Sequence, residues 1–267
     1  MDPLTTPGSI LGEGVNIGTY ADHRFHPEEH GRMNFGPFGH GGLNAPITFE
    51  DAAGRRIFIG WIGEGRPEEV QRASGWSGVM SLPRVLSLSG DGALLVGPAP
   101  ELEVLRGDHC RCGDIPIPPR SNVFLQDVRG ECLEIGAEME PDDAGEVGIK
   151  VRCSPRCEEQ TLISYNHAEK CLSLDVGRSS LSPDVEDRGA ECGPLELAEG
   201  ESLKLRIFLD RSVVEVFANG RLCLTKRIYP SRSDSLGVAL FARGGRAKLR
   251  SMDAWHMSSI WPAGEEG

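Results

Sequence analysis

The chain has 267 residues and carries 40 Asp and Glu side chains against 28 Lys and Arg, which gives a formal net charge of −12. Its basic residues are scattered, in runs no longer than pairs such as Arg55 and Arg56. Nucleic acids and anionic membrane surfaces are bound by basic faces, so the sequence predicts neither partner. No apolar run approaches the roughly 20 residues that cross a bilayer, and the first residues lack the regions of a signal peptide. We therefore expect a cytoplasmic protein.

Glycine and proline indicate the fold class. The chain contains 34 Gly and 18 Pro, spread without a repeat, which predicts many tight turns. No window of 12 or more residues combines the apolar spacing of a helix with freedom from Gly and Pro. The sequence therefore predicts an all-β protein.

The first third of the chain contains short apolar and β-branched runs separated by turn sequences. Residues 51–54 and 89–92 are typical of hairpin turns. Four or so antiparallel strands in about 55 residues match the size of one propeller blade. The strands predicted here cover 45–49, 56–62, 79–82, 85–88 and 93–96.

A Pro-rich stretch predicts a domain boundary. Residues 115–119 (IPIPP) favour a stiff extended linker, which we place at 113–120, between a partial β-propeller at 1–112 and a second domain at 121–267. Nine short strands with regular turns indicate that this second domain is a β-sandwich. They are predicted at 133–139, 147–151, 160–165, 171–174, 202–209, 213–217, 222–225, 236–241 and 247–252.

Stretches on both sides of this linker resemble a known enzyme family. Residues 54–62 (GRRIFIGWI) and 75–84 (GWSGVMSLPR) resemble the last propeller blade of glycoside hydrolase family 32, which contains the invertases, levanases and inulinases. Residues 208–220 (FLDRSVVEVFANG) resemble the signature of that family's C-terminal sandwich. The similarity continues through 227–230 and 237–242, and in all covers roughly residues 15–262.

The resemblance implies both an architecture and an activity. Family members are five-bladed propellers joined to a β-sandwich, and they cleave β-fructofuranosidic bonds, as in sucrose and fructans, with retention and without a metal or organic cofactor. Retention needs two nearby carboxyl groups, one as nucleophile and one as acid and base. In the family, an Asn-Asp-Pro-Asn motif supplies the nucleophile and a Glu-Cys motif the acid. An Arg-Asp-Pro motif steadies the sugar hydroxyls.

These catalytic motifs are missing from the expected places. The sequence contains neither Asn-Asp-Pro nor Arg-Asp-Pro. Glu-Cys occurs at Glu131 and Glu191, but both lie on the sandwich side of the linker, and for Glu131 an exposed Glu on a half-buried strand is the simpler interpretation. We therefore expect no catalytic residue in this chain. It resembles the last blade, a strand or two of the preceding blade and the whole sandwich, and we predict that it is inactive by itself.

Two blade residues are candidates for substrate binding. The tryptophan that matches Trp61 tends to line the sugar pocket in the family, and aromatic rings suit the apolar C–H face of a sugar. A core tryptophan between blades is the alternative. Asn44 lies where relatives often carry a residue near the active-site rim, and it could bind a sugar hydroxyl. Its surroundings are rich in glycine, which also favours a role in a turn.

Other clusters favour structural roles. Asp210 and Glu215 lie five residues apart across a turn, which suits a turn cap and a surface or cross-strand partner. His23, His26, His30 and His40 lie in a polar stretch that we interpret as a solvated loop rather than a metal site. The eight cysteines could include halves of a zinc site around Cys110, Cys112, Cys153 and Cys157, but reduced thiols explain them more simply.

Two functions from different classes remain open. The chain is either part of a β-fructofuranosidase, whose other blades lie elsewhere, or a noncatalytic carbohydrate-binding or subunit-assembly module. A blade buries its faces against neighbouring blades, so we expect residues 1–110 to be marginally stable alone, whereas the sandwich should fold by itself. A leader peptide on a longer form of the chain would change the expected location.

Overall fold

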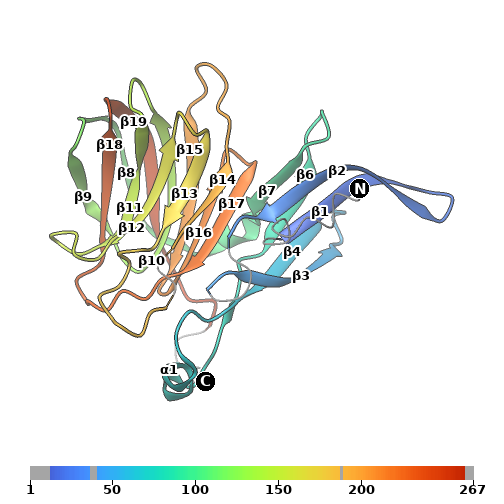
Figure 1. Ribbon diagram of the computed structural model, residues 1–267, viewed down its shortest axis with the longest axis horizontal. Coiled ribbons are helices and arrows are strands. Elements are labelled where there is room, and N and C mark those ends of the chain that lie inside the picture. The colour runs from blue at the N-terminus through green and yellow to red at the C-terminus, as the bar shows by residue number, and fades with distance from the viewer. Residues whose placement is uncertain (1–12, 37–40, 187–188, 262–267) are drawn as a thin grey trace.

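The computed structural model describes residues 13–36, 41–186 and 189–261, and in this part the chain is nearly all β (Figure 1). A two-stranded ribbon and a small sheet form the propeller part, and two six-stranded sheets form a sandwich beside them. The predicted all-β class, with a partial propeller followed by a sandwich, is confirmed.

The small sheet is the predicted blade. Its strands follow the order β3-β4-β6-β7, with β5 pairing with the end of β4. The Asp51 carboxylate closes the first hairpin, because it accepts hydrogen bonds from the N–H groups of Ala53 and Arg55 at 2.9 and 2.8 Å. The strands are β3 (Leu43–Glu50), β4 (Arg56–Ile62), β5 (Val79–Met80), β6 (Arg84–Leu88) and β7 (Leu94–Pro98).

The sandwich buries a large core between its two sheets. One sheet has the order β17-β16-β15-β10-β19-β8, and the other β14-β13-β12-β11-β18-β9. Alternate residues point inward; in β15, for example, Leu205, Ile207 and Leu209 join the core. The strands are β8 (Arg106–Ile117), β9 (Asn122–Arg129), β10 (Cys132–Glu140), β11 (Glu146–Cys153), β12 (Thr161–Asn166), β13 (Cys171–Asp175), β14 (Ala190–Pro194), β15 (Leu203–Asp210), β16 (Val213–Ala218), β17 (Leu222–Arg227), β18 (Gly237–Arg243) and β19 (Ala247–Met257).

The predicted linker at 113–120 is wrong for most of its length. β8 runs continuously from Arg106 to Ile117 and pairs with β19, with Pro116 opposite Lys248. A strand at the edge of a sheet tolerates proline, because its outer side needs no ladder hydrogen bonds, and β8 is such an edge. The sandwich therefore begins at Arg106, before the predicted boundary.

The histidine-rich stretch is a hairpin rather than the predicted loop. β1 (Glu13–Ala21) pairs with β2 (Arg24–Asn34), and Asp22 and His23 form the turn with positive φ angles of 51° and 61°. Positive φ at both central residues is the geometry of a tight hairpin turn. The ribbon is mostly exposed, so its sequence lacks the alternation that marks a half-buried strand. His40 lies outside the described residues.

The blade packs on the outer face of the sheet that contains β15, β16 and β17. Buried Val96 and Leu102 contact Phe208 and Phe217, whose rings meet edge to face with centroids 6.1 Å apart. The backbone joins the two parts as well, since Val96 N–H donates to the Gly220 carbonyl at 2.8 Å.

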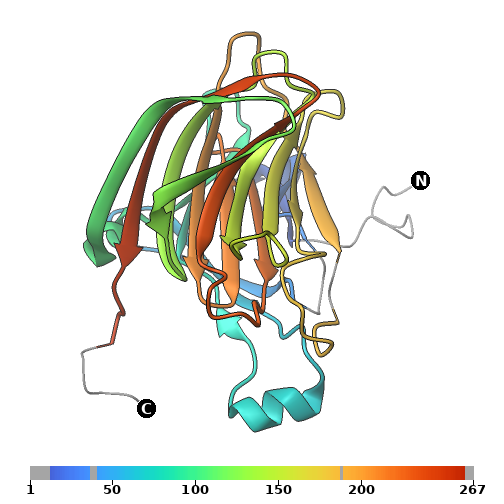
Figure 2. The same cartoon turned by 90° about the vertical axis from the view of Figure 1, so that its left-hand side faces the viewer.

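Helical structure in the described residues is limited to short segments. The 3₁₀ helix η2 (Pro100–Leu105) precedes β8, and α1 (Glu68–Ser74) projects from the blade away from both sandwich sheets (Figure 2). No helix in the described part of the chain has the length and apolar character needed to cross a membrane.

Candidate functional site

Strand pairing brings the two predicted substrate-binding residues together. Asn44 of β3 lies opposite Trp61 of β4, and Trp61 also lies opposite Met80 of β5. The Trp61 side chain is 41% exposed. Its ring lies against Gly78, where a Cβ atom would come within 2.2 Å of the indole nitrogen and where φ is +68°. Glycine at 78 therefore lets this ring lie flat at the end of the blade.

Asn44 has a structural role in addition to any contact with sugar. Its side chain is buried, and its amide Nδ2 donates to the Gly42 carbonyl at 2.9 Å. Next to it, the strand pairing is irregular and Ala45 has a positive φ of 46°. This amide therefore helps to hold the bend that leads into β3. Its binding to a substrate stays a prediction, as does that of Trp61.

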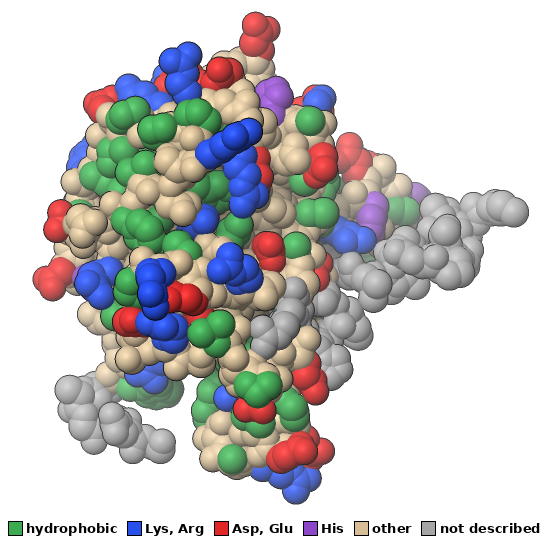
Figure 3. Space-filling view, turned by 60° about the vertical axis from the view of Figure 1, so that its left-hand side comes forward, with side chains coloured by type: hydrophobic (Ala, Val, Ile, Leu, Met, Phe, Trp, Pro, Cys, Tyr) green, Lys and Arg blue, Asp and Glu red, His purple; other side chains and the backbone are tan. Residues whose placement is uncertain are grey.

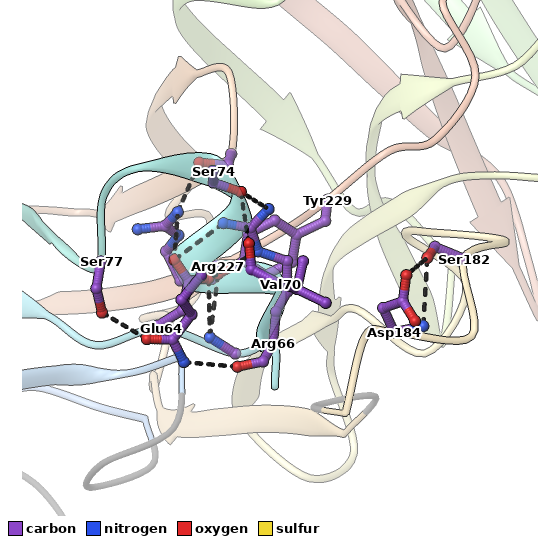
Figure 4. A network of polar contacts seen from close by, with 12 residues as sticks. Glu64, Arg66, Val70, Ser74, Ser77, Ser182, Asp184, Arg227 and Tyr229 are labelled. Atoms are coloured by element: carbon purple, nitrogen blue, oxygen red, sulfur yellow. Dashed lines mark hydrogen bonds and ion pairs between the residues drawn. The ribbon is translucent and has the colours of Figure 1, made fainter. Parts of the chain in front are cut away.

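A buried carboxylate lies just after Trp61 (Figure 4). The Glu64 side chain is 3% exposed and accepts two hydrogen bonds of 3.1 Å from the Arg66 guanidinium. It also accepts one from the Tyr229 hydroxyl and lies 3.7 Å from the guanidinium of Arg227. Burial acts to raise the pKa of this carboxyl, but the hydrogen bonds from Arg66 and Tyr229 outweigh it and lower the pKa. Glu64 is thus held as an anion.

The other members of this cluster stack cations on aromatic rings. The guanidinium carbons of Arg66 and Arg227 lie 4.6 and 5.1 Å from the centre of the Tyr229 ring, and 5.2 and 5.0 Å from that of Trp76. Arg66 also binds Ser74 of α1 at 3.3 Å. Burial and the bond to Glu64 raise the pKa of Tyr229 to about 12, so its hydroxyl keeps its proton. The cluster ties the segment that carries α1 to the end of β17.

A second buried charge pair joins the blade to the sandwich. Arg84, fully buried, donates to the Glu215 carboxylate at 2.6 Å, and the Leu82 N–H donates to the other oxygen at 2.7 Å. The guanidinium also donates to Thr225, Asn34 and the Met33 carbonyl, at 2.8, 3.2 and 3.3 Å. The expectation of a surface position for Glu215 is wrong, because it is buried and faces the blade, although it also lies opposite Phe208 and Thr225 of the neighbouring strands.

Twelve of the described carboxyl groups have a pKa shifted away from that of a general acid. Such an acid needs a raised pKa, yet every carboxyl with a resolved shift among residues 13–36, 41–186 and 189–261 is shifted downward. Glu131 lies 3.6 Å from Arg152, and Glu191 lies 3.4 Å from Lys226. The same ranges contain no group of His, Cys, Asp and Glu arranged to hold a metal ion, and their eight cysteines are free thiols.

Sequence reasoning singled out Trp61 and Asn44 but neither Glu64 nor Arg66. The Tyr229 bond to Glu64 joins residues 165 positions apart, and the Arg84 bond to Glu215 joins residues 131 apart. A local pattern cannot reveal such contacts. Arg227 and Tyr229 lie in a stretch that carries the family resemblance, which is the one signal that points to this cluster.

Known proteins are similar to this chain over nearly its whole length. Residues 101–256 match the model "Glycosyl hydrolases family 32 C terminal", and residues 6–98 match "Glycosyl hydrolases family 32 N-terminal domain". A levanase of Bacillus subtilis is 34% identical over 216 residues, covering 78% of this chain and 31% of the levanase. A fructan 1-exohydrolase of Hordeum vulgare is 31% identical over 280 residues, covering 88% of this chain and 46% of the exohydrolase.

Solved structures support the same fold. Fructan 1-exohydrolase IIa from Cichorium intybus has a TM-score of 0.82 at 22% identity, covering 91% of this chain and 54% of that one. An exo-inulinase from Aspergillus awamori has a TM-score of 0.76 at 23% identity, covering 92% of this chain and 50% of the inulinase. The chain thus spans about half the length, or less, of the relatives that it matches.

Proposed function

The chain belongs to glycoside hydrolase family 32, and from this premise we propose that it supplies the last propeller blade and the sandwich of a β-fructofuranosidase. The reaction is hydrolysis of a β-fructofuranosidic bond in sucrose or a fructan, with retention of configuration. The names of the relatives, a levanase and a fructan 1-exohydrolase, support this substrate class. No metal or organic cofactor takes part in the proposed reaction.

The observation that carries the proposal is the position of Trp61. Its ring is 41% exposed at the end of the blade and lies against Gly78. One face of a sugar ring is apolar, so it gains free energy by stacking on such a surface. Glu64 lies three residues further along, and its ion pairs hold the segment after β4 against the sandwich. We assign Trp61 to substrate binding and the Glu64 cluster to positioning.

We propose that the nucleophile and the acid come from outside this chain. The sequence contains neither Asn-Asp-Pro nor Arg-Asp-Pro. The buried glutamates Glu64, Glu134, Glu159 and Glu215 all bind cations or several hydrogen-bond donors, so none is available as a proton donor. The remaining blades would come from a longer form of the polypeptide or from another subunit.

A chimaera tests this function. This chain replaces the matching part of the Bacillus subtilis levanase, and the product is assayed on sucrose, inulin and levan. We expect fructose release, and we expect Trp61→Ala to raise KM up to about tenfold, the value of one aromatic contact. Trp61→Phe keeps a stacking surface and should retain most of the affinity. A folded chimaera without activity, or an unchanged KM in Trp61→Ala, would contradict the proposal.

The closed core of the sandwich favours a second candidate function, that of a noncatalytic module. All members of the main core cluster lie between Ile117 and Ala254, within the sandwich. Such a module would bind inulin or levan, or a partner subunit, without Trp61. Affinity electrophoresis of the whole chain in gels that contain either fructan separates the two functions. Retardation that persists in Trp61→Ala supports the module, and retardation that disappears supports the blade site.

A further inference from the structure

The sandwich carries a basic pocket far from the blade. It lies at one corner of the sheet β14-β13-β12-β11-β18-β9, where the turn after β8 meets the end of β18, and its volume is about 360 Å³. Figure 3 brings the side of the sandwich that carries β9 forward and shows Lys and Arg side chains there among hydrophobic, uncharged and acidic ones. The pocket is lined chiefly by Arg120, Ser121, Asn122, Lys150, Phe241 and Arg243.

Lys150 is the central residue of this pocket. Its neighbours Ile149 and Val151 in β11 point into the core, so Lys150 points outward, yet only 7% of it is exposed. The ammonium lies 5.5 Å from the centre of the Phe241 ring. Within the described ranges the structure gives this ammonium neither a hydrogen bond nor an ion pair. Lys150 lines the pocket and its ammonium is not fully enclosed, so a ligand that enters the pocket can reach this charge and supply a counter-charge.

The groups that face Lys150 do not supply that counter-charge. Burial lowers the pKa of Lys150, the thiols of Cys157 and Cys153 act to raise it, and the guanidinium groups of Arg243 and Arg178 lower it further. The nearby thiol of Cys153 stays protonated, because burial raises its pKa to about 12. Glu146 is bound to Arg243 at 2.8 Å and balances only that cation. The local charge is therefore positive in a chain whose net charge is −12.

We propose that this pocket binds a phosphate group, either as the free ion or as the phosphate of a phosphorylated sugar. The Lys150 ammonium offers three donors, and Arg120 and Arg243 offer planar guanidinium groups that match the oxygen atoms of a phosphate. The Asn122 amide adds another donor at the rim. This site is independent of the proposed fructosidase function, because it lies on the sandwich and uses none of the blade residues.

Titration of the whole chain with inorganic phosphate, at constant low ionic strength and followed by calorimetry, tests the site. We expect wild type to bind, and we expect Lys150→Met to weaken binding at least tenfold. This variant keeps most of the side-chain stem and removes a positive charge that lies near the cations Arg243 and Arg178, so it should be no less stable than wild type in phosphate-free buffer. Arg120→Gln, an exposed position, should weaken binding several-fold without changing stability.

Lys204→Met is the matched control, since it removes one positive charge from an exposed position in β15 of the other sheet. It should bind phosphate as wild type does. A hexose phosphate that competes better than inorganic phosphate identifies a sugar phosphate as the ligand, and the reverse order identifies the free ion. Equal phosphate affinity in wild type and Lys150→Met, or no binding by wild type at millimolar phosphate, would overturn the proposal.

Discussion

Replacing Glu215 by alanine is expected to lower the free energy of unfolding by about 3–5 kcal/mol, the usual cost of removing one partner of a buried ion pair. Arg84 is fully buried and would lose its ion pair with Glu215. The Leu82 N–H would lose its acceptor as well. Urea denaturation measures the total loss, and hydrogen exchange locates it. Protection from hydrogen exchange should fall in residues 43–98 of the blade and stay unchanged in the core of the sandwich.

Two variants control for this prediction. Glu68→Ala breaks an exposed pair with Arg72 on α1 and should cost less than about 1 kcal/mol. The double variant Arg84→Met with Glu215→Leu removes both charges and should recover most of the lost stability. If Glu215→Ala lowers the free energy of unfolding no more than Glu68→Ala does, the ion pair of Arg84 and Glu215 does not stabilise the contact between blade and sandwich. Equal exchange protection of blade and sandwich in the wild-type chain would contradict the expected difference in stability between them.

Glu159→Gln is expected to cost about 3 kcal/mol at pH 7, because hydrogen bonds to a charged group contribute about 1.5–3 kcal/mol each when desolvation is included. The buried Glu159 carboxylate accepts the N–H and hydroxyl of Ser231 at 2.8 and 2.6 Å, and the hydroxyl of Ser235 at 2.6 Å. Leu181 and Arg232 add backbone donors at 2.8 and 3.1 Å. The side-chain NH₂ group of glutamine is itself a donor, and it would face some of these N–H and O–H groups, which would then lack an acceptor.

The pH dependence of this difference follows from the pKa of Glu159. Burial acts to raise that pKa, but the hydrogen bonds from Ser231 and Ser235 outweigh it and lower the pKa from 4.5 to about 2. A carboxyl whose pKa is lower in the folded state stabilises the protein above its unfolded value, here 4.5. The difference between wild type and Glu159→Gln should therefore be full at pH 7 and shrink as the pH falls from 4.5 towards 2. Glu199→Gln, at an exposed loop position, should show no difference at either pH. A stability difference between wild type and Glu159→Gln that stays constant down to pH 2 would contradict this account.

Most of the strands could be predicted from sequence because burial imposes alternation. β15 and β4 carry apolar residues on the face that they bury, and turn residues mark their ends. The strands that were missed lack this signal. β8, β9 and β14 lie at sheet edges, β8 and β14 contain proline, and the ribbon of β1 and β2 is mostly exposed. α1 has only seven residues and no buried face, so its sequence carries no helical periodicity.

The site was predictable only in part. Trp61 and Asn44 were identified through the family resemblance, and strand pairing then explains why they are neighbours. The Glu64 cluster and the pair of Arg84 with Glu215 depend on contacts between residues more than 130 positions apart. A charged residue in a strand is typical of a solvent-facing position, and only tertiary packing turned Glu215 and Lys150 into buried groups.

We propose above all that this chain contributes residues that bind the sugar and residues that hold them in place, whereas the carboxyl groups that cleave the bond lie outside it. The direct measurement is fructose release from sucrose, inulin and levan by the purified 267-residue chain. We predict no release above the uncatalysed rate with any of the three. Saturable release that copurifies with the chain and is lost on substitution of one of its own Asp or Glu residues would contradict the account.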